Sequence, residues 1–369
     1  MRFFMKSGQG PAPNAPTASH ARIKAKWVEM AHLGRQRELA MKTKQWFSPE
    51  PGSPLVLFIA SSSRSGSTLL DFMLGSHPMG VSAGEARRLQ GFVLKDMELL
   101  SLDDENYPLT CSCGEPLERC PFWRQVEGFF GTPFREAAFK TRRKRAWRSL
   151  VMALYGALGP WCLRMLARSW PALRAEMEIG CNCIRLHRAI SRVSGSLFVV
   201  DSSKSIYHYL LLHLAAPQAM RLIVLVRDGR AVAHSMVRGV RGGQWKKGSL
   251  HPFLQASRQW ARTTRTIMLL SRRTPVPQRF LVRYEDICRD HMEVLRQVSE
   301  KWGLPPWEDP LEAPPREWHI IGGSPSVRFE RAVRTVRADE SWKQSIDHEL
   351  AEAFERIAGS LNRKLGYHR

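Results

Sequence analysis

The sequence predicts an α/β fold in which a parallel sheet is flanked by helices. Four continuous apolar runs are bounded by turn residues, which is typical of strands buried on both faces of a sheet. A helical pattern follows each run, and a repeated strand–helix order favours parallel strands joined by right-handed crossovers. The four predicted strands are Leu55–Ala60, Leu197–Val200, Leu222–Val226 and Phe280–Val282.

The segments outside these strands indicate how the chain is divided. Residues 1–54 are rich in Pro, Ala and Lys, and we expect a basic N-terminal extension with one short helix from about Ala21 to Lys44. Residues 55–369 are then predicted to form a single domain. From about residue 86 to residue 196 the pattern is helical with few strand signals, which predicts a largely helical insertion in that domain.

The first predicted strand runs into a loop of small and polar residues, SSSRSGST at 61–68, and a helix follows. Backbone N–H groups of such a loop, and of the helix N-terminus behind it, are well placed to bind a phosphate. The arrangement is P-loop-like, but Ser67 stands where the GxxxxGK[ST] signature of nucleotide kinases has its lysine. Arg64 is the cation that this loop offers. The alternative is an ordinary polar loop without a ligand.

A second strand-to-helix junction carries further phosphate-binding side chains. Residues 226–238 read VRDGRAVAHSMVR and present Arg227, Ser235 and Arg238. Guanidinium groups hold phosphates through fork-shaped pairs of donors. An arginine–aspartate pair after a strand can equally be a structural ion pair, but together with the first loop it predicts two phosphate sites.

The two junctions together carry a family resemblance. RSGSTLL after a buried strand and LVRDGRAVAHSMVR after a later one resemble the sulfotransferases that use 3'-phosphoadenosine 5'-phosphosulfate (PAPS). The resemblance is strongest to the tyrosylprotein and carbohydrate sulfotransferases. It implies that the second loop holds the 3'-phosphate and that the first holds the 5'-phosphosulfate through Arg64, Ser65, Gly66, Ser67, Thr68 and Leu69.

The resemblance also implies the reaction and its catalytic groups. A sulfuryl group would pass from PAPS to a hydroxyl or amine by in-line displacement, with no metal required. Arg64 is the first candidate to neutralise the charge that develops in transfer. Lys204, in VDSSKS at the end of the second predicted strand, resembles the lysine that family members place near the leaving group. A solvated surface lysine is the alternative for Lys204.

Glu85 is the favoured general base, because it follows Arg64 by 21 residues, as the catalytic glutamate does in the relatives named above. His77 is an alternative base, although Ser-His-Pro is typical of a helix-ending turn. A third possibility is that Glu85 only pairs with Arg87 or Arg88.

Two more segments resemble family contacts to the nucleotide. Tyr284, in VRYEDI, resembles a strand-end tyrosine near the nucleotide, with core packing as the equal alternative. The stretches GGSPSVRF (322–329) and DESWK (339–343) resemble the loop that closes over the adenine and the 3'-phosphate. They offer Arg328 and Lys343 as anion contacts.

The chain is strongly basic, with 56 Lys and Arg against 34 Asp and Glu and a formal charge of +22. Such an excess implies an anionic partner. The run Arg142–Arg145 is either a nucleic-acid patch or a solvated helix face, and no dedicated nucleic-acid-binding motif accompanies it. The functions left beside the sulfotransferase are a P-loop nucleotide kinase and a non-enzymatic protein that binds nucleic acid or anionic membranes.

Five of the seven cysteines lie in two short segments of the insertion. They admit a zinc site, disulfides or unligated thiols, and CxC spacing is less typical of zinc than CxxC. These cysteines are Cys111, Cys113, Cys120, Cys181 and Cys183.

The sequence leaves the acceptor open among a glycan, a lipid headgroup, a tyrosine and a small metabolite. The apolar window Leu150–Leu166 is short and interrupted, so we expect no transmembrane span there. The N-terminus lacks the apolar core of a secretory signal. The sequence therefore predicts a cytoplasmic protein, with possible peripheral contact with anionic surfaces.

Overall fold

A computed structural model describes residues 54–100, 107–240, 250–312, 317–324 and 336–368 of the protein. Arg328 and almost all of the predicted N-terminal extension lie outside these described residues.

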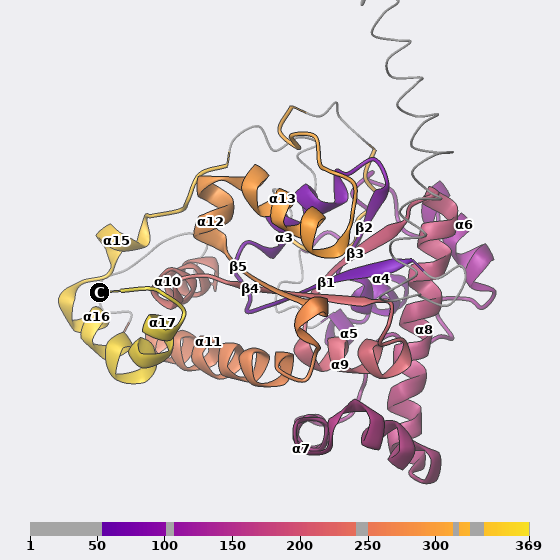
Figure 1. The fold of residues 1–369 in the computed structure, drawn as a ribbon, viewed down its shortest axis with the longest axis horizontal. Helices are drawn as coiled ribbons and strands as arrows, with labels where there is room; N and C mark the ends of the chain where they lie inside the picture. Colours follow the sequence, from indigo (N-terminus) through magenta and orange to yellow (C-terminus); the bar gives the residue numbers. More distant parts are fainter. Residues whose placement is uncertain (1–53, 101–106, 241–249, 313–316, 325–335, 369) are drawn as a thin grey trace, which may run out of the picture. The chain divides into compact units, whose positions relative to one another are not determined.

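The centre of the fold is a parallel five-stranded sheet with the strand order β2-β3-β1-β4-β5 (Figure 1). The four strands predicted from the sequence are all present, so the predicted α/β fold is confirmed. Because every strand runs in the same direction, the loops at the carboxyl ends meet at one edge of the sheet, where α/β proteins bind ligands. The strands are β1 (Leu55–Ser61), β2 (Gly80–Gly84), β3 (Phe198–Lys204), β4 (Met220–Val226) and β5 (Arg279–Arg283).

Among the strands in the described part of the chain, β2 is the one that the sequence pattern missed. Its residues, GVSAG, are mostly too small to register as an apolar run. Small side chains are needed there because the Phe198 ring packs against Gly80, where an added Cβ would lie 2.4 Å from the ring. The strand pairs with β3 at the sheet edge and places Glu85 directly after its last residue.

Helices cover both faces of the sheet, and alternate side chains of β1 supply the two apolar cores. Leu57 and Ile59 pack in the core under α3 (Ser67–Gly75), α12 (Tyr284–Arg289) and α13 (His291–Trp302), above the sheet in Figure 1. Val56, Phe58 and Ala60 face the opposite core. The helices on that side include α8 (Pro171–Ser194), α9 (Ile206–Ala215), α10 (Gly229–Val240) and α11 (Leu250–Ser271).

The segment between β2 and β3 is helical, as predicted, and its described residues contain no strand. It consists of η1 (Ala86–Arg88), α4 (Leu89–Leu94), α5 (Met97–Leu100), α6 (Pro121–Phe130), α7 (Arg145–Ser169) and α8. At the other end of the domain, η2 (Val276–Gln278) precedes β5. The C-terminal elements are α15 (Trp342–Ser345), α16 (His348–Phe354), η3 (Glu355–Gly359) and α17 (Ser360–Lys364).

Helix α7 differs from the sequence prediction. It has 25 residues, and by length and composition it is sufficient to cross a membrane, although the predicted interruption is present at Gly159 (φ 78°, ψ 172°). The helix is mostly exposed: only 28% of its apolar window is buried, and Trp161 is 72% exposed.

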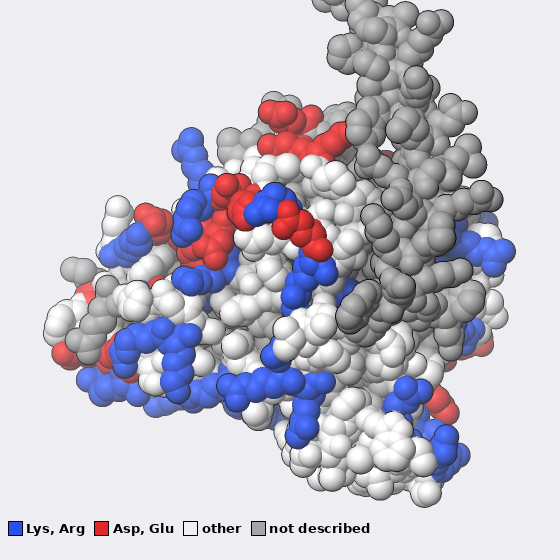
Figure 2. Space-filling view, viewed as in Figure 1, with Lys and Arg blue, Asp and Glu red and all other residues white. Residues whose placement is uncertain are grey.

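Positive charge gathers beside α7. Figure 2 shows Lys and Arg side chains in a band along α11, next to the largely uncharged surface of α7, and the two helices are in contact. The exposed arginines of α11 are Arg258, Arg262 and Arg265. The run Arg142–Arg145 is also exposed, and its first two arginines pair with Asp96 and Glu176.

Candidate active site

The loop between β1 and α3 has the backbone shape of an anion site. Arg64 (φ 64°) and Gly66 (φ 87°) both adopt left-handed conformations, and such turns point successive N–H groups toward one concavity. Ser62 and Ser65 tie the loop together through a hydroxyl–hydroxyl hydrogen bond of 2.8 Å. Gly66 precedes the first residue of α3 and has no side chain with which to cap the helix. The N-terminus of α3 therefore faces the same concavity.

The predicted residues of this loop are differently exposed. The Arg64 side chain is exposed, Ser65 and Ser67 are buried, and Thr68 and Leu69 are half-buried. Leu69 packs against the core, so only its backbone is free to act on a ligand in the loop.

Arg227 connects the second loop to the first. It follows the last residue of β4, is 6% exposed, and donates a 3.1 Å hydrogen bond from Nη1 to the Arg64 carbonyl. Its guanidinium lies over the Tyr284 ring, 4.4 Å from the centroid. That ring fills the space beside Gly66, where an added Cβ would lie 2.4 Å from Tyr284 Cδ2. The two loops predicted separately from the sequence therefore form one continuous surface.

Residues 339–341, near the C-terminus, contact Arg227 and Arg238. Arg227 Nη2 donates to the Asp339 carbonyl at 3.1 Å, and Arg238 Nη1 donates to Ser341 Oγ at 3.2 Å. Burial by itself raises the pKa of Asp339. Hydrogen bonds from Ser341 and the nearby positive charges of Arg227 and Arg238 outweigh burial, so the pKa of Asp339 is lowered. Ser235 is half-buried on α10, between the two arginines in sequence.

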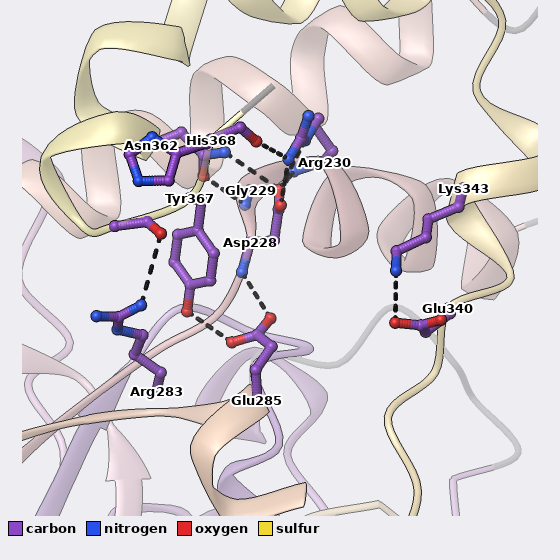
Figure 3. Close-up of polar contacts among 11 residues, drawn as sticks. Asp228, Gly229, Arg230, Arg283, Glu285, Glu340, Lys343, Asn362, Tyr367 and His368 are labelled. Atoms are coloured by element: carbon purple, nitrogen blue, oxygen red, sulfur yellow. Dashed lines mark hydrogen bonds and ion pairs between the residues drawn. The ribbon is translucent and has the colours of Figure 1, made fainter. Parts of the chain in front are cut away.

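A pocket of about 450 Å³ opens beside Arg227 and Tyr284. Figure 3 shows that its carboxylates already have partners: Asp228 binds Arg230, and Glu285 accepts from the Asp228 N–H and the Tyr367 hydroxyl. Lys343 pairs with Glu340 at 2.5 Å (Figure 3). The pocket is lined by Arg227, Asp228, Arg230, Tyr284, Glu285, Ala338, Asp339, Glu340, Trp342, Lys343, Gly366, Tyr367 and His368.

Glu85 and Lys204 meet at the carboxyl ends of the neighbouring strands β2 and β3. Glu85 is 1% exposed, and its Oε1 contacts Lys204 Nζ and accepts the Gly323 N–H at 3.2 Å. Arg88 Nε lies 2.7 Å from the other carboxylate oxygen. Burial by itself raises the pKa of Glu85, but Lys204, Arg88 and Arg87 outweigh it and lower the pKa to about 2. Glu85 is thus a buried carboxylate held ionised by three cations.

Lys204 is the last residue of β3 and has a left-handed backbone (φ 65°), which turns its side chain toward Glu85. The side chain is 21% exposed, so Lys204 is not a freely solvated surface lysine. From its place in VDSSKS, three residues before Lys204, Asp201 could cap the next helix or orient Lys204. Instead Ser205 caps α9, and Asp201 accepts the Ser203 N–H at 2.9 Å and contacts His187.

The segment 317–324 joins the two halves of the site. The Gly323 N–H donates to Glu85, and the next residue, Ser324, donates its N–H to Thr68 Oγ1 at 3.1 Å. The sequence resemblance placed this glycine-rich stretch over the adenine and the 3'-phosphate, but its described residues lie at Glu85. The later stretch containing Lys343 lies at the second loop, and Arg328 lies outside the described residues.

A model of the sulfotransferase family matches residues 54–309, more than half of the chain. The chain belongs to the sulfotransferase family. It is therefore an enzyme, which disfavours a non-enzymatic binding protein and confirms the resemblance seen in the two loops. No curated protein matches the chain.

Several solved structures are similar to this sulfotransferase. The sulfotransferase domain from the curacin biosynthetic pathway is 21% identical and aligns over 85% of this chain and 98% of that domain, with a TM-score of 0.45. The sulfotransferase domain of the Synechococcus PCC 7002 olefin synthase is also 21% identical, over 88% and 99% of the two chains, with a TM-score of 0.46. A sulfotransferase from Mycobacterium tuberculosis H37Rv is 15% identical over 87% and 81%, with a TM-score of 0.42.

His77, the alternative candidate for the base of this sulfotransferase, lies at the other end of β2 from Glu85. It sits in the turn before β2, whereas Glu85 follows the opposite end of that strand. Its Nδ1 accepts the Met79 N–H at 3.0 Å, and its ring packs against Trp307 and Phe198. His77 is therefore part of the core.

Sequence reasoning also missed Asp71, another buried carboxyl of the sulfotransferase. It lies on α3 and accepts a 2.7 Å hydrogen bond from Ser82 Oγ. Burial raises its pKa to about 8, which the Ser82 hydrogen bond only partly offsets. Its signal in the sequence is a single charge inside the apolar stretch LLDFML.

The clustered cysteines of the sulfotransferase separate into two groups. Cys181 is exposed and Cys183 is buried on α8, where the Cys183 thiol lies 3.6 Å from the Phe139 carbonyl. Cys111, Cys113 and Cys120 gather elsewhere, around His319. The sequence reasoning grouped all five cysteines and missed the histidine.

Proposed function

We propose that this sulfotransferase moves a sulfuryl group from PAPS to a hydroxyl, or an amine, of its acceptor by in-line displacement. The observation that carries the proposal is the Arg227 bridge, which unites the two predicted phosphate loops beside the Glu85–Lys204 pair. In this proposal the first loop, from Arg64 to Leu69, binds the 5'-phosphosulfate. Arg227, Ser235 and Arg238 bind the 3'-phosphate, and the adjoining pocket with Tyr284 and Lys343 receives part of the nucleotide.

The proposed transfer needs only the acceptor, the donor and side chains of the enzyme. The acceptor oxygen forms a bond to sulfur while the bond from sulfur to the bridging phosphate oxygen breaks. Adenosine 3',5'-bisphosphate leaves with that oxygen, and the acceptor proton passes to the Glu85 carboxylate. Lys204 and Arg64 neutralise charge on the leaving and transferring oxygens.

The depressed pKa of Glu85 fits this role only if donor binding changes it. A carboxylate with a pKa of about 2 is a weak base. Lys204 is the strongest of the cations that lower this pKa, and the donor gives it a second anion to contact. Movement of Lys204 toward the donor would remove the largest of the cationic influences and raise the pKa of Glu85. In this proposal donor binding thus activates the base.

Calorimetric titration with adenosine 3',5'-bisphosphate, without magnesium, tests the donor site. ATP with magnesium is the control ligand, because the rival kinase would prefer it. A lost charged hydrogen bond costs about 1.5–3 kcal/mol, so we expect Arg227→Ala to weaken binding by about 10- to 150-fold. Arg289→Ala is the matched control, since Arg289 is a 74% exposed arginine on α12.

Two outcomes contradict the proposal. Preference for ATP with magnesium would favour the kinase. Equal affinity of Arg227→Ala and the unmodified protein for the bisphosphate would remove the second loop from the donor site. Thermal unfolding of each variant separates lost binding from lost folding.

A further inference from the structure

Three thiols and one imidazole converge outside the active site. Cys111 and Cys113 flank a turn in the insertion, Cys120 immediately precedes α6, and His319 comes from the C-terminal segment 199 residues after Cys120. Their potential ligand atoms all lie within 4.8 Å of one another. Cys111 and Cys120 are buried, and the other two are half-buried.

Three separations within this cluster are close to those of a tetrahedral zinc site, and all the potential ligand atoms lie within 4.8 Å of one another. Zn–S bonds of about 2.3 Å and Zn–N bonds of about 2.0–2.1 Å place two sulfurs about 3.8 Å apart and a sulfur and a nitrogen about 3.6 Å apart. Cys113 Sγ and Cys120 Sγ are 3.7 Å apart. His319 Nδ1 lies 3.3 Å from Cys120 Sγ and 3.6 Å from Cys111 Sγ. A disulfide would need two sulfurs about 2.05 Å apart, and it would not account for the third thiol and the imidazole that lie beside them.

The surroundings orient the ligands as they do in zinc proteins. His319 presents Nδ1 to the sulfurs, while its Nε2 lies 3.7 Å from a Glu317 carboxylate oxygen. A carboxylate near the second ring nitrogen favours the tautomer that keeps its proton there and leaves the first nitrogen able to bind metal. Phe122 stacks flat on the imidazole, with ring centroids 4.9 Å apart and an interplanar angle of 4°.

Backbone hydrogen bonds fix the chain around the cysteines. Cys111 and Gly114 close a turn through a 2.9 Å hydrogen bond, and the Cys111 N–H donates to the Glu115 carbonyl at 2.8 Å. Cys120 is the residue before α6, and a helix N-terminus favours the thiolate that a metal requires. The thiols of Cys111 and Cys120 both contact His319 Nδ1, and Cys113 Sγ contacts Cys120 Sγ.

We propose that Cys111, Cys113, Cys120 and His319 bind one structural Zn²⁺ ion. Four protein ligands leave no open position, which is the mark of a structural rather than a catalytic zinc site. The ion would tie the insertion to residues 317–324. On the other side of the same junction, Ser112 Oγ contacts the Trp318 carbonyl and the Ile320 N–H at 2.5 and 2.8 Å.

The position of this site gives it a consequence for catalysis, which rests on the proposed function. The segment that zinc would anchor donates the Gly323 N–H to Glu85, and the Ile321 carbonyl accepts the Glu85 N–H at 2.8 Å. Loss of the ion would release this segment from the insertion and loosen the contacts that position Glu85. Zinc in this proposal positions the catalytic segment and takes no part in sulfuryl transfer.

Elemental analysis of the purified full-length protein tests the site without donor or acceptor. We expect one zinc per chain, and a loss of at least fivefold in Cys120→Ser. Cys181→Ser is the matched control, because Cys181 is an exposed cysteine of the same insertion. Two substitutions of His319 separate loss of a ligand from misfolding. His319→Cys should retain zinc through four thiolates, while His319→Ala should lose zinc.

Cobalt supplies a second readout that is independent of activity. Co²⁺ added to the metal-free protein should give the strong visible absorption of a tetrahedral thiolate site, and Zn²⁺ should abolish it. No bound zinc and no such absorption would overturn the proposal. A disulfide among the three cysteines, shown by thiol counting before and after reduction, would also overturn it. Bisphosphate binding tests the donor site separately, so either proposal can fail alone.

Discussion

Replacement of Glu85 by glutamine tests the buried charge cluster most directly. Glutamine keeps the shape of the side chain and an oxygen to accept the Gly323 N–H, but it removes the negative charge beside Lys204 and Arg88. The pKa of Glu85 falls from 4.5 to about 2 on folding. At 1.36 kcal/mol per pKa unit, the ionised carboxylate stabilises the folded protein by about 3 kcal/mol at pH 7.

The stabilising effect of the Glu85 carboxylate depends on pH. A carboxyl whose pKa is lowered on folding contributes fully above its unfolded pKa and loses the contribution as the pH falls through its folded pKa. The free energy of unfolding of Glu85→Gln should therefore lie about 3 kcal/mol below that of the unmodified protein at pH 7. The difference should shrink to about 1 kcal/mol at pH 3.

Urea unfolding at the two pH values measures this difference. Glu293→Gln is the matched control, because Glu293 also has a pKa lowered to about 2 but lies in an exposed ion pair with Arg296, which solvent screens. We expect that control to change stability little. Equal stability of Glu85→Gln and the unmodified protein at pH 7 would refute the claim that the Glu85 charge stabilises the fold through Lys204 and Arg88.

The same variant tests the proposed base. Because the change removes the proton acceptor but none of the groups proposed to bind the donor, Glu85→Gln should still bind adenosine 3',5'-bisphosphate while transfer falls by about 100-fold or more. Turnover at the rate of the unmodified enzyme would reject Glu85 as the base, whatever the stability result.

Three further predictions concern other parts of the molecule. Gly66→Ala forces a Cβ into the Tyr284 ring at a positive φ, so it should weaken bisphosphate binding at least tenfold by calorimetry; unchanged affinity would contradict the loop geometry. Asp71 has a raised pKa, so in urea unfolding the free energy of unfolding of the unmodified protein should fall relative to that of Asp71→Asn as the pH rises from 4 toward 8, and a constant difference would contradict the raised pKa. Trp161 is exposed on α7, and α7 contacts the arginine-bearing helix α11, so Trp161→Glu should reduce cosedimentation with phosphatidylserine vesicles, and phosphatidylcholine vesicles should bind neither form.

The parts of the site that the sequence predicted are those carried by local pattern. The strand β1, the loop from Ser62 to Gly66 and α3 follow one another within a single stretch of chain. Their apolar run, small residues and helical period can be recognised without knowing any other part of the fold. The same holds for Arg227 at the end of β4.

The contacts that the sequence could not predict join residues far apart in the chain. Glu85 meets Lys204 because β2 lies beside β3, and β2 itself is too rich in small residues to be recognised as a strand. The pKa of Asp71 depends on burial, which no local pattern measures.

By itself, then, the sequence determined the fold class, the family and the position of the two loops predicted to bind anions, because each depends on short runs of residues whose physical preferences are local. Only the tertiary structure decided which charges neutralise one another and which thiols share a histidine. Cys120 and His319 are 199 residues apart, and nothing in the spacing of the cysteines points to that partner. Sheet order and the path of segment 317–324 bring such groups together, and both depend on packing across the whole domain.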